Sequence, residues 1–297
     1  MPAGGASRAR EPLTDAFVYG GALAAFAVTL APFLYVAFRS ISTPEAIFYN
    51  QVIFFPDAVY LDSYRLFVSN GQVLRYYANT VVIVTAGTAC NVVLAFITAF
   101  VLARRDYVLR NYLMAFIVIT MFFSGGLVPF YMVVRGLGIL DTRWSLVLPF
   151  ALSPLYVIIA RTFIQASIPE ELFESAAVDG ASKWKMVWSI AAPLSKPLMA
   201  VIALWAAVYF WNSFFWATVF VVDPDKQPIQ VWLRRLLTIG TSNEAGLAME
   251  ATFATQSGKS EQMKFVAIMV TIIPILSVYP FLQRFFVKGV VIGALKH

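Results

Sequence analysis

Residues Glu174–Pro197 read ESAAVDGASKWKMVWSIAAPLSKP, the longest strongly polar interval between two hydrophobic stretches of the chain. Their pattern predicts two short helices joined by a glycine. A capping box with a proline in the first turn, from Ser167 to Glu170, predicts where the first helix begins. Asp179-Gly180 predicts where it ends, because glycine adopts at little cost the left-handed conformation that closes a helix.

The second predicted helix follows this glycine. Ser182 is placed to cap its first turn, and we expect Pro193 and Pro197 to end it. Three bulky residues of the second helix recur at helical spacing: Trp184, Val187 and Trp188. The residues expected on one side of the first helix do the same: Leu172, Phe173, Ala176 and Ala177. The segment 167–196 is therefore predicted to form a helix–glycine–helix unit.

This unit has the composition of a docking surface. Its small residues would let a partner's backbone approach closely: Ala176, Ala177, Gly180 and Ala181. Its acidic residues, Glu174 and Asp179, would offer negative charge to that partner. An ordinary amphipathic hairpin lying at a membrane surface has the same periodicity. The periodicity alone does not choose between the two interpretations.

The composition places the whole chain in a membrane. Of its 297 residues, 60% are hydrophobic and 13% are charged, whereas soluble proteins have about a quarter charged residues. The net charge of +6 is modest and lies in loops, which suits membrane topology better than nucleic-acid binding. The single cysteine, Cys90, excludes an intrachain disulfide and a paired-cysteine metal or redox site.

Six apolar stretches are long enough, at about 20 residues, to cross a bilayer as helices. They predict an all-α protein with six transmembrane spans: Ala16–Phe38, Ala78–Ala103, Tyr112–Val134, Trp144–Ala166, Pro197–Val222 and Met263–Val287. The expected domains are a tail at 1–15, a transmembrane domain at 16–287 and a tail at 288–297. The run after residue 15 is longer than a signal-peptide core, so we expect a retained first span.

Positive charge near the short loops predicts the orientation. Arg104, Arg105 and Arg110 crowd the loop between spans two and three, and the termini and the 167–196 unit carry further lysines and arginines on the same side. We therefore expect this side, with both termini, to be cytoplasmic. The long segments 39–75 and 223–262 would then be external, and the second could contact an extracytoplasmic partner or be a solvated loop.

The external segments and the span interiors contain local signals. Leu61–Phe67 is predicted to form a short surface helix that ends at Asn70-Gly71, and Asn79-Thr80 is predicted to begin span two. Glycines and prolines should thin and kink spans three and four, for close packing or for gating: Ser124-Gly125-Gly126, Pro129, Pro149 and Pro154.

Span five carries a stripe of aromatic rings and one amide. Trp205, Tyr209, Asn212, Trp216 and Phe220 recur every three or four residues, which predicts one helix face. Sugars stack their C–H surfaces on rings and need hydrogen-bond partners for their hydroxyls, so the stripe could line a sugar pathway. Packing against helices and lipid would use the same aromatic residues. Of the five residues, Asn212 is the one that such packing explains least well.

The sequence lacks the motifs that are typical of other classes of membrane protein. It contains no HExxH zinc site, no GxSxG nucleophile and no GxxxxGK[ST] phosphate loop, and its only histidine is terminal. We therefore expect no enzymatic activity, no bound metal and no cofactor. The spans carry no acidic residue at mid-depth, as an ion-coupled secondary carrier usually would. Arg161, a basic residue within span four, should snorkel to the surface or meet the acidic residues of the 167–196 unit.

Separated segments of the chain, in order, resemble the permease subunits of carbohydrate-uptake ATP-binding-cassette importers. The spacing of Glu174, Ala176, Gly180, Ile190 and Pro193 is similar to their coupling loop, with Ser175 where the family usually has alanine. The other matching segments are Phe122–Gly126, Trp211–Ser213 and Lys288–Gly293. The likeness covers nearly the whole chain.

The resemblance implies a type I importer permease fold and a set of partners. It implies a second permease subunit, two cytoplasmic ATPase subunits that hold ATP and Mg²⁺, and an extracytoplasmic protein that delivers an oligosaccharide, alginate being one candidate. The implied location is the cytoplasmic membrane of a bacterium. The implied ATPase-coupling residues are Glu174, Ser175, Ala176, Ala177, Asp179, Gly180, Ile190 and Pro193. The alternatives are an ion-coupled carrier and a membrane-embedded enzyme.

Overall fold

The computed structural model of the protein describes residues 12–49, 51–52, 55–238 and 261–277. These residues form helices joined by short loops, with no strand among them, which confirms the predicted all-α class for this part of the chain. The chain divides into two compact units, residues 1–67 with 244–270 and residues 68–243 with 271–297. The tail at 288–297, the last part of span six and most of the segment 239–262 lie outside the described residues.

The first unit contains α1 (Pro12–Ile41), α2 (Pro44–Phe48) and most of α3 (Asp62–Ser69). A buried glutamine, Gln262, joins these helices to the helical residues that follow it. Its Nε2 donates to the carbonyl of Ser42 at 2.6 Å, and its Oε1 accepts from the Ser63 hydroxyl at 2.6 Å. Both ends of a buried amide are thus satisfied, as burial requires.

The helix predicted at 61–67 is confirmed as α3, and its place at the outer surface stays a prediction. The prediction for the start of span two is wrong. The next helix, α4 (Gly71–Ala103), begins about two turns earlier than Ala78, because Asn70 accepts hydrogen bonds from the N–H groups of Gln72 and Val73. Asn79 and Thr80 lie inside α4 and are buried. Their side chains bond to another loop instead of beginning the helix.

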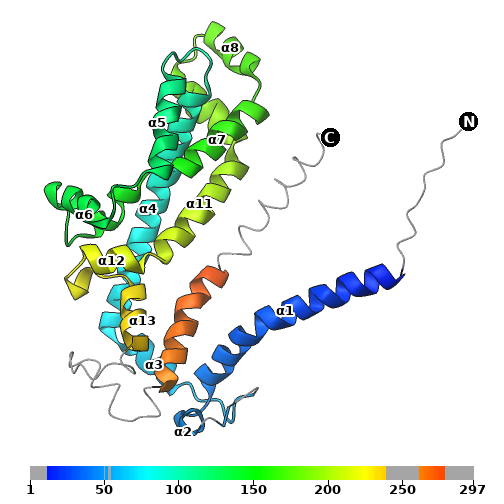
Figure 1. Cartoon of the computed structure of the whole chain (residues 1–297), viewed down its shortest axis with the longest axis vertical. Helices are drawn as coiled ribbons and strands as arrows, with labels where there is room; N and C mark the ends of the chain where they lie inside the picture. Colours follow the sequence, from blue (N-terminus) through cyan, green and yellow to red (C-terminus); the bar gives the residue numbers. More distant parts are fainter. Residues whose placement is uncertain (1–11, 50, 53–54, 239–260, 278–297) are drawn as a thin grey trace, which may run out of the picture. The chain divides into compact units, whose positions relative to one another are not determined.

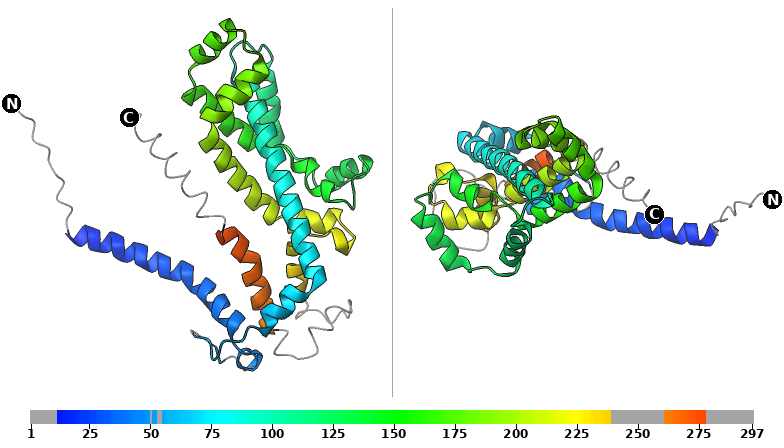
Figure 2. Two further views of the ribbon diagram at one scale, coloured as in Figure 1. Left: turned by 180° about the vertical axis from the view of Figure 1, so that it is seen from behind. Right: turned by 90° about the horizontal axis from the view of Figure 1, so that it is seen from above.

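The second unit is built on α4. Helices α7 (Pro154–Ser167) and α11 (Lys196–Trp211) run alongside it, as Figure 1 and the left view of Figure 2 show. The residues between the three helices include Phe96, Ala160 and Ile202, none of which has any exposed surface. A core that continues from helix to helix can carry a displacement of one helix to the others.

The predicted span at 112–134 is not one kinked helix. It consists of α5 (Arg110–Phe122) and α6 (Leu127–Gly136), whose axes differ by 119°. The chain turns at Phe123–Gly126, where Gly126 has a positive φ of 82° that a side chain would disfavour. The glycines identified in the sequence therefore break the helix instead of only thinning it.

Span four is also broken, as its prolines predict. Two 3-10 turns, η1 (Arg143–Leu146) and η2 (Leu148–Phe150), precede α7, and the bend between the two parts is 45°. Pro154 stands in the first turn of α7, where its missing N–H has no helical partner to lose. The kink expected at Pro149 and Pro154 is confirmed.

Span five is interrupted in its second half. Helix α11 ends at Trp211, and α12 (Phe214–Phe220), η4 (Pro224–Lys226) and α13 (Ile229–Thr238) follow. Among the described residues, two helices, Asp15–Ile41 and Gly71–Ala103, are long and apolar enough to cross a membrane, and three bent pairs raise this to at most five. The number of six spans stays a prediction.

We predict that Gly87 sets the closest approach of α4 and α11. A Cβ at this position would lie 2.5 Å from the ring of Phe210, which is buried. Gly87→Val should therefore lower the free energy of unfolding by about 1–3 kcal/mol, the usual cost of overpacking. Thermal unfolding of the purified protein in detergent measures this. Gly71→Ala, in the first turn of the same helix with no atom within 4 Å of the added Cβ, is the control. Equal melting temperatures for Gly87→Val and wild type would contradict the close contact.

Candidate functional site

The first helix of the 167–196 unit is α8 (Glu170–Val178), at the end of the bundle of α4, α7 and α11 (Figure 1). It ends in a Schellman motif: the N–H of Ala181 donates to the carbonyl of Ala176 at 2.9 Å, and the N–H of Gly180 to that of Ala177 at 3.0 Å. Gly180 has a φ of 74°, so the predicted glycine stop is confirmed. The predicted capping box is wrong, because Ser167 is the last residue of α7.

The second helix begins as predicted but does not end as predicted. The hydroxyl of Ser182 accepts from the N–H of Lys185 at 3.3 Å and caps α9 (Lys183–Lys185). A π-helical segment, η3 (Met186–Ala191), and α10 (Ala192–Leu194) continue it. Pro193 therefore lies inside the helix, directly after the widened turns. The chain then bends by 82° into α11, with Pro197 in the first turn of that helix.

The two helices present different residues to the core and to the surface. Phe173, Met186 and Val187 are buried in the cluster that also contains residues of α4, α7 and α11. Trp184, Trp188 and Leu172 are exposed, so the predicted apolar faces are only partly correct. Of the predicted coupling residues, Ala176 and Ile190 are half-buried, and the others are exposed: Glu174, Ser175, Ala177, Asp179, Gly180 and Pro193.

Arg104 joins α8 to the end of α4. Its Nη1 lies 3.1 Å from Oε1 of Glu170, and its guanidinium lies over the ring of Phe173, 4.9 Å from the centroid. Phe173 in turn meets Phe100 of α4 edge to face at 5.5 Å. Arg104 counted only as a positive charge in the topology prediction. Its four-residue separation from Phe100, a spacing at which helical side chains are neighbours, was the available signal.

The last carbonyls of α4 are satisfied by α7. The Nε of Arg161 donates to the carbonyl of Leu102 at 3.0 Å, and Nε2 of Gln165 donates to that of Ala103 at 3.4 Å. That Arg161 snorkels to a membrane surface stays a prediction. Its predicted contact with an acidic residue of the 167–196 unit is wrong, because the side chain bonds to a carbonyl of α4 instead. It caps a helix end, where a cation is also favoured by the helix dipole.

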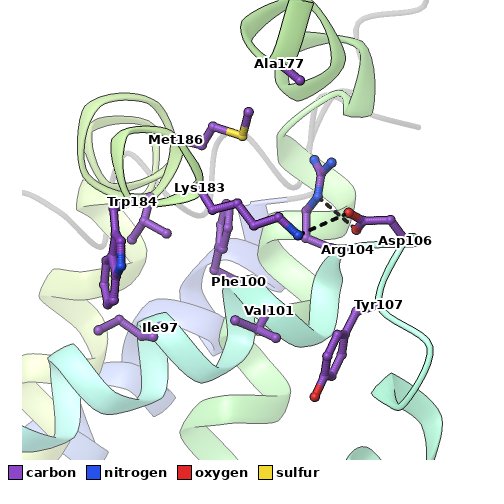
Figure 3. Close-up of a pocket in the computed structure, with 11 residues that line it drawn as sticks. Ile97, Phe100, Val101, Arg104, Asp106, Tyr107, Ala177, Lys183, Trp184 and Met186 are labelled. Carbon is purple, nitrogen blue, oxygen red and sulfur yellow. Dashed lines mark ion pairs between the residues drawn. The ribbon is translucent and has the colours of Figure 1, made fainter. Parts of the chain in front are cut away.

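A pocket of about 250 Å³ lies between the end of α4 and the 167–196 unit (Figure 3). Its floor is apolar. Its rim carries Arg104 and Lys183, which both pair with Asp106 at 3.5 and 3.7 Å. The remaining lining residues come from α4, the following loop and the 167–196 unit: Ile97, Phe100, Val101, Tyr107, Ala177, Trp184, Met186 and Val187.

The aromatic stripe of span five does not lie on one helix face, so that prediction is wrong. Asn212 is the C-cap of α11, and its amide donates to the carbonyl of Val208 at 2.8 Å. Beyond this break Trp216 belongs to α12, where its ring contacts those of Phe130, Phe150 and Phe220 at 5.0, 5.5 and 5.1 Å. Asn212 is explained by the end of the helix, because its amide supplies a donor to a terminal carbonyl.

Tyr209 is the member of the stripe that lines a second pocket, of about 300 Å³, beside the break in span four. On α4, Asn91 donates through Nδ2 to the carbonyl of Phe150 at 2.7 Å. Its Oδ1 is buried and has no partner among the described residues. The hydroxyl groups and the further ring of the wall, from Ser153, Tyr156 and Phe150, were not predicted from the sequence. The remaining lining residues are Pro149, Leu152, Pro154 and Ala206.

The chain is similar over most of its length to two proteins of Bacillus subtilis. It is 39% identical to protein LplC over 271 residues, which cover 91% of this chain and 90% of that protein. It is 36% identical to the polygalacturonan/rhamnogalacturonan transport system permease protein YtcP over 288 residues, covering 97% and 99% of the two chains.

Two solved structures share the fold. The first, of a bacterial ABC transporter involved in the import of the acidic polysaccharide alginate, has a chain that matches with a TM-score of 0.84 and 27% identity, covering 96% of this chain and 100% of that one. The second, of a bacterial alginate ABC transporter in complex with an alginate pentasaccharide-bound periplasmic protein, matches with a TM-score of 0.53 and 14% identity over 94% and 96% of the two chains.

The family model described as the binding-protein-dependent transport system inner membrane component matches residues 22–292. This match covers α1 from residue 22 onward, the broken spans, the 167–196 unit and both pockets. It assigns the chain a transport role and contradicts the alternatives of a membrane-embedded enzyme and an ion-coupled carrier. The protein is therefore a member of the family of inner membrane components of binding-protein-dependent transport systems, with the fold of a type I importer permease.

Proposed function

We propose that this chain is a permease subunit that moves an acidic oligosaccharide through the cytoplasmic membrane, driven by ATP hydrolysis in partner subunits. The main support is a structural match: 96% of this chain aligns with a chain from a transporter that imports an acidic polysaccharide. The 36% identity to a polygalacturonan/rhamnogalacturonan permease supports the same substrate class. An extracytoplasmic binding protein delivers the sugar, and a second permease subunit completes the pathway.

The 167–196 unit is the part that we propose docks in a groove of the ATPase. Its exposed end carries small and acidic residues around the exposed Val178, so another backbone can approach it closely: Glu174, Ser175, Ala177, Asp179 and Gly180. The same unit is buried on its other side against the bundle. In this proposal the unit and both termini are cytoplasmic, and the two ATPase subunits hold ATP and Mg²⁺.

The contacts of Arg104 and Phe173 support α8 as the transmitting element. They connect a docked helix to α4 through an ion pair, a cation–π contact and a ring–ring contact. Closure of the ATPase dimer would displace α8, and the packed core would move α4, α7 and α11 with it as rigid bodies. Transport is then coupled to hydrolysis by the different contacts of the unit in two states.

The pocket at Asn91 and Tyr209 is the proposed place of the sugar within this subunit. It combines the rings of Phe150 and Tyr209 with the hydroxyls of Ser153 and Tyr156, the two kinds of group that a sugar needs. Trp205, Asn212 and Trp216 do not line this pocket. We propose that they border the route to it, Trp216 through its contact with Phe150 and Trp205 through its contact with Tyr156 at 6.2 Å.

We predict that Gly180→Trp abolishes ATPase association, because it adds bulk to the docking end and forces a side chain onto a positive φ. Co-purification of the ATPase and uptake into vesicles measure the effect. Gly180→Asn is the matched control, since asparagine tolerates the left-handed conformation and adds little bulk. Normal uptake by Gly180→Trp would count against docking at this turn.

We predict that Arg104→Ala lowers the number of sugars transported per ATP. It removes the ion pair with Glu170 from a side chain that is 18% exposed, together with the cation–π contact with Phe173, which is worth about 0.5–2 kcal/mol. Lys183→Ala removes an ion pair from a side chain that is 88% exposed and should change stability by less than about 1 kcal/mol. Reconstituted vesicles allow uptake and ATP hydrolysis to be measured together. Equal coupling ratios for both variants and wild type would refute transmission through Arg104.

We predict that Ser153→Leu, which fills the pocket beside Tyr209, lowers maximal uptake and leaves the complex assembled. The Ser153 side chain makes no helix-capping hydrogen bond, so its removal costs no cap. Thr162→Leu, an exposed position of the same helix away from the pocket, is the control. Uptake that is lowered equally in both variants would place the effect in α7 as a whole instead of in the pocket.

A further inference from the structure

Arg143 is an exposed arginine in the first 3-10 turn of span four, at the end of the second unit opposite α8. Its Nε donates to Oδ1 of Asn79 at 2.8 Å. Its two terminal amino groups, Nη1 and Nη2, have no hydrogen-bond or ion-pair partner among the residues that the structure describes. One nitrogen of the guanidinium is thus held, and the other two are available.

The group that holds Arg143 is itself fixed. Asn79 is 2% exposed, and its Nδ2 donates to the carbonyls of Asp225 at 2.8 Å and Gln227 at 2.9 Å. Its Oδ1 therefore has a defined direction, and so does the guanidinium that bonds to it. A guanidinium that is ordered before binding loses less conformational freedom when a ligand arrives.

The acidic residues nearby already have cationic partners. Asp225 lies 2.6 Å from Arg75. Asp141 and Asp223 both pair with Lys226, at 3.2 and 3.0 Å. The N–H of Asp223 and the ammonium of Lys226 keep the pKa of Asp141 below its usual value, so this carboxylate remains ionised and bound at neutral pH. The described carboxylates of this cluster therefore leave Arg143 without a counter-ion.

We infer that Arg143 binds the carboxylate of an acidic sugar unit as the oligosaccharide enters the permease. Two free amino groups on a planar guanidinium match the two oxygens of a carboxylate. The next residue, Trp144, has 53% of its surface exposed and offers a ring on which a sugar can stack. The inference rests on the proposed function and its orientation, and it adds the residue that selects the charge of the substrate.

The position of Arg143 fits an entrance. It precedes Phe150, a wall residue of the sugar pocket, by seven positions in the same broken span. Along α4, Asn79 and Asn91 are twelve residues apart, about 18 Å of helix. An oligosaccharide of a few units can therefore have one unit at Arg143 while another reaches the pocket. The aromatic contacts of Trp216 with Phe150 lie in the same part of the second unit.

The test uses the complete importer, reconstituted in vesicles with its binding protein, and two probes: a uronic-acid oligosaccharide and the same oligosaccharide with its carboxyl groups reduced to alcohols. Arg143→Gln should lower kcat/KM for uptake of the acidic probe about tenfold to a hundredfold, as expected for a lost hydrogen bond to a charged group. Uptake of the reduced probe should not fall. Arg143→Lys should lie between wild type and Arg143→Gln, because it keeps the charge and loses the planar pair of donors.

Arg135→Gln is the matched control. Arg135 is an exposed arginine in the last turn of α6, in the same connection between spans. Its substitution by glutamine removes the same charge. Equal losses for Arg135→Gln and Arg143→Gln would show general attraction by positive charge and overturn the inference. An equal rise for both probes in the concentration of binding protein at half-maximal uptake, with unchanged maximal uptake, would instead place Arg143 in the contact with that protein and also overturn the inference.

The proposed function can fail separately. If the wild-type importer takes up neither probe, the substrate class is wrong, whatever the variants do. If it takes up the acidic probe and Arg143→Gln takes it up equally well, the substrate class stands and the role of Arg143 does not. The melting temperature of each assembled variant, within a few degrees of wild type, shows that the comparison is between folded complexes.

Discussion

Backbone polar groups have no water to bond in the interior of a membrane, so every interrupted helix needs a donor or acceptor from elsewhere. In the second unit much of this requirement is met through α4. Asn79 donates to two carbonyls of the loop before α13, and Asn91 donates to Phe150 at the break in span four. At the other end, Arg161 donates to a terminal carbonyl of α4 itself. The breaks are tolerable because α4, or a helix beside it, supplies the missing partners.

This arrangement explains why α4 can be both long and central. It is 33 residues long and unbroken, and its polar side chains face the places where neighbouring helices are interrupted. A helix whose asparagines bond to two separate breaks also fixes those breaks relative to each other. Any motion of α4 therefore reaches the loop at 225–229 and the turn at Phe150 together. The core that α4 shares with α7 and α11 gives the same motion a path to the 167–196 unit.

The two ends of α4 have different chemistry, and this difference suits the proposed transport. At the α8 end, an arginine is committed to a carboxylate and to an aromatic ring, which makes a stiff connection. At the other end, Arg143 is only oriented, through one nitrogen, by a buried asparagine. In our proposal the first arginine transmits force and the second recognises charge. A guanidinium can do either, and its use depends on how many of its five N–H donors the protein already occupies.

The apolar spans illustrate what composition can and cannot specify. Period and length predict that residues 112–134 and 197–222 are helical and lie in lipid, and most of those residues are helical. They do not predict that the first stretch turns by 119° or that the second is interrupted at Asn212–Ser213. Hydropathy is insensitive to such breaks, because a broken helix and a continuous one have the same residues. The aromatic stripe was misassigned for this reason.

The sequence by itself determined the all-α class, the family, the glycine stop at Gly180 and the cap at Ser182, because each depends on local residues or on a pattern within a few turns. The tertiary structure alone decided the roles of Arg104, Arg161, Asn79 and Arg143, whose partners, apart from Asp106 beside Arg104, lie between 59 and 148 positions away in the chain. A side chain's partner at such a distance depends on how helices pack, and packing leaves no local period in the sequence. The same four residues carry most of the proposed mechanism.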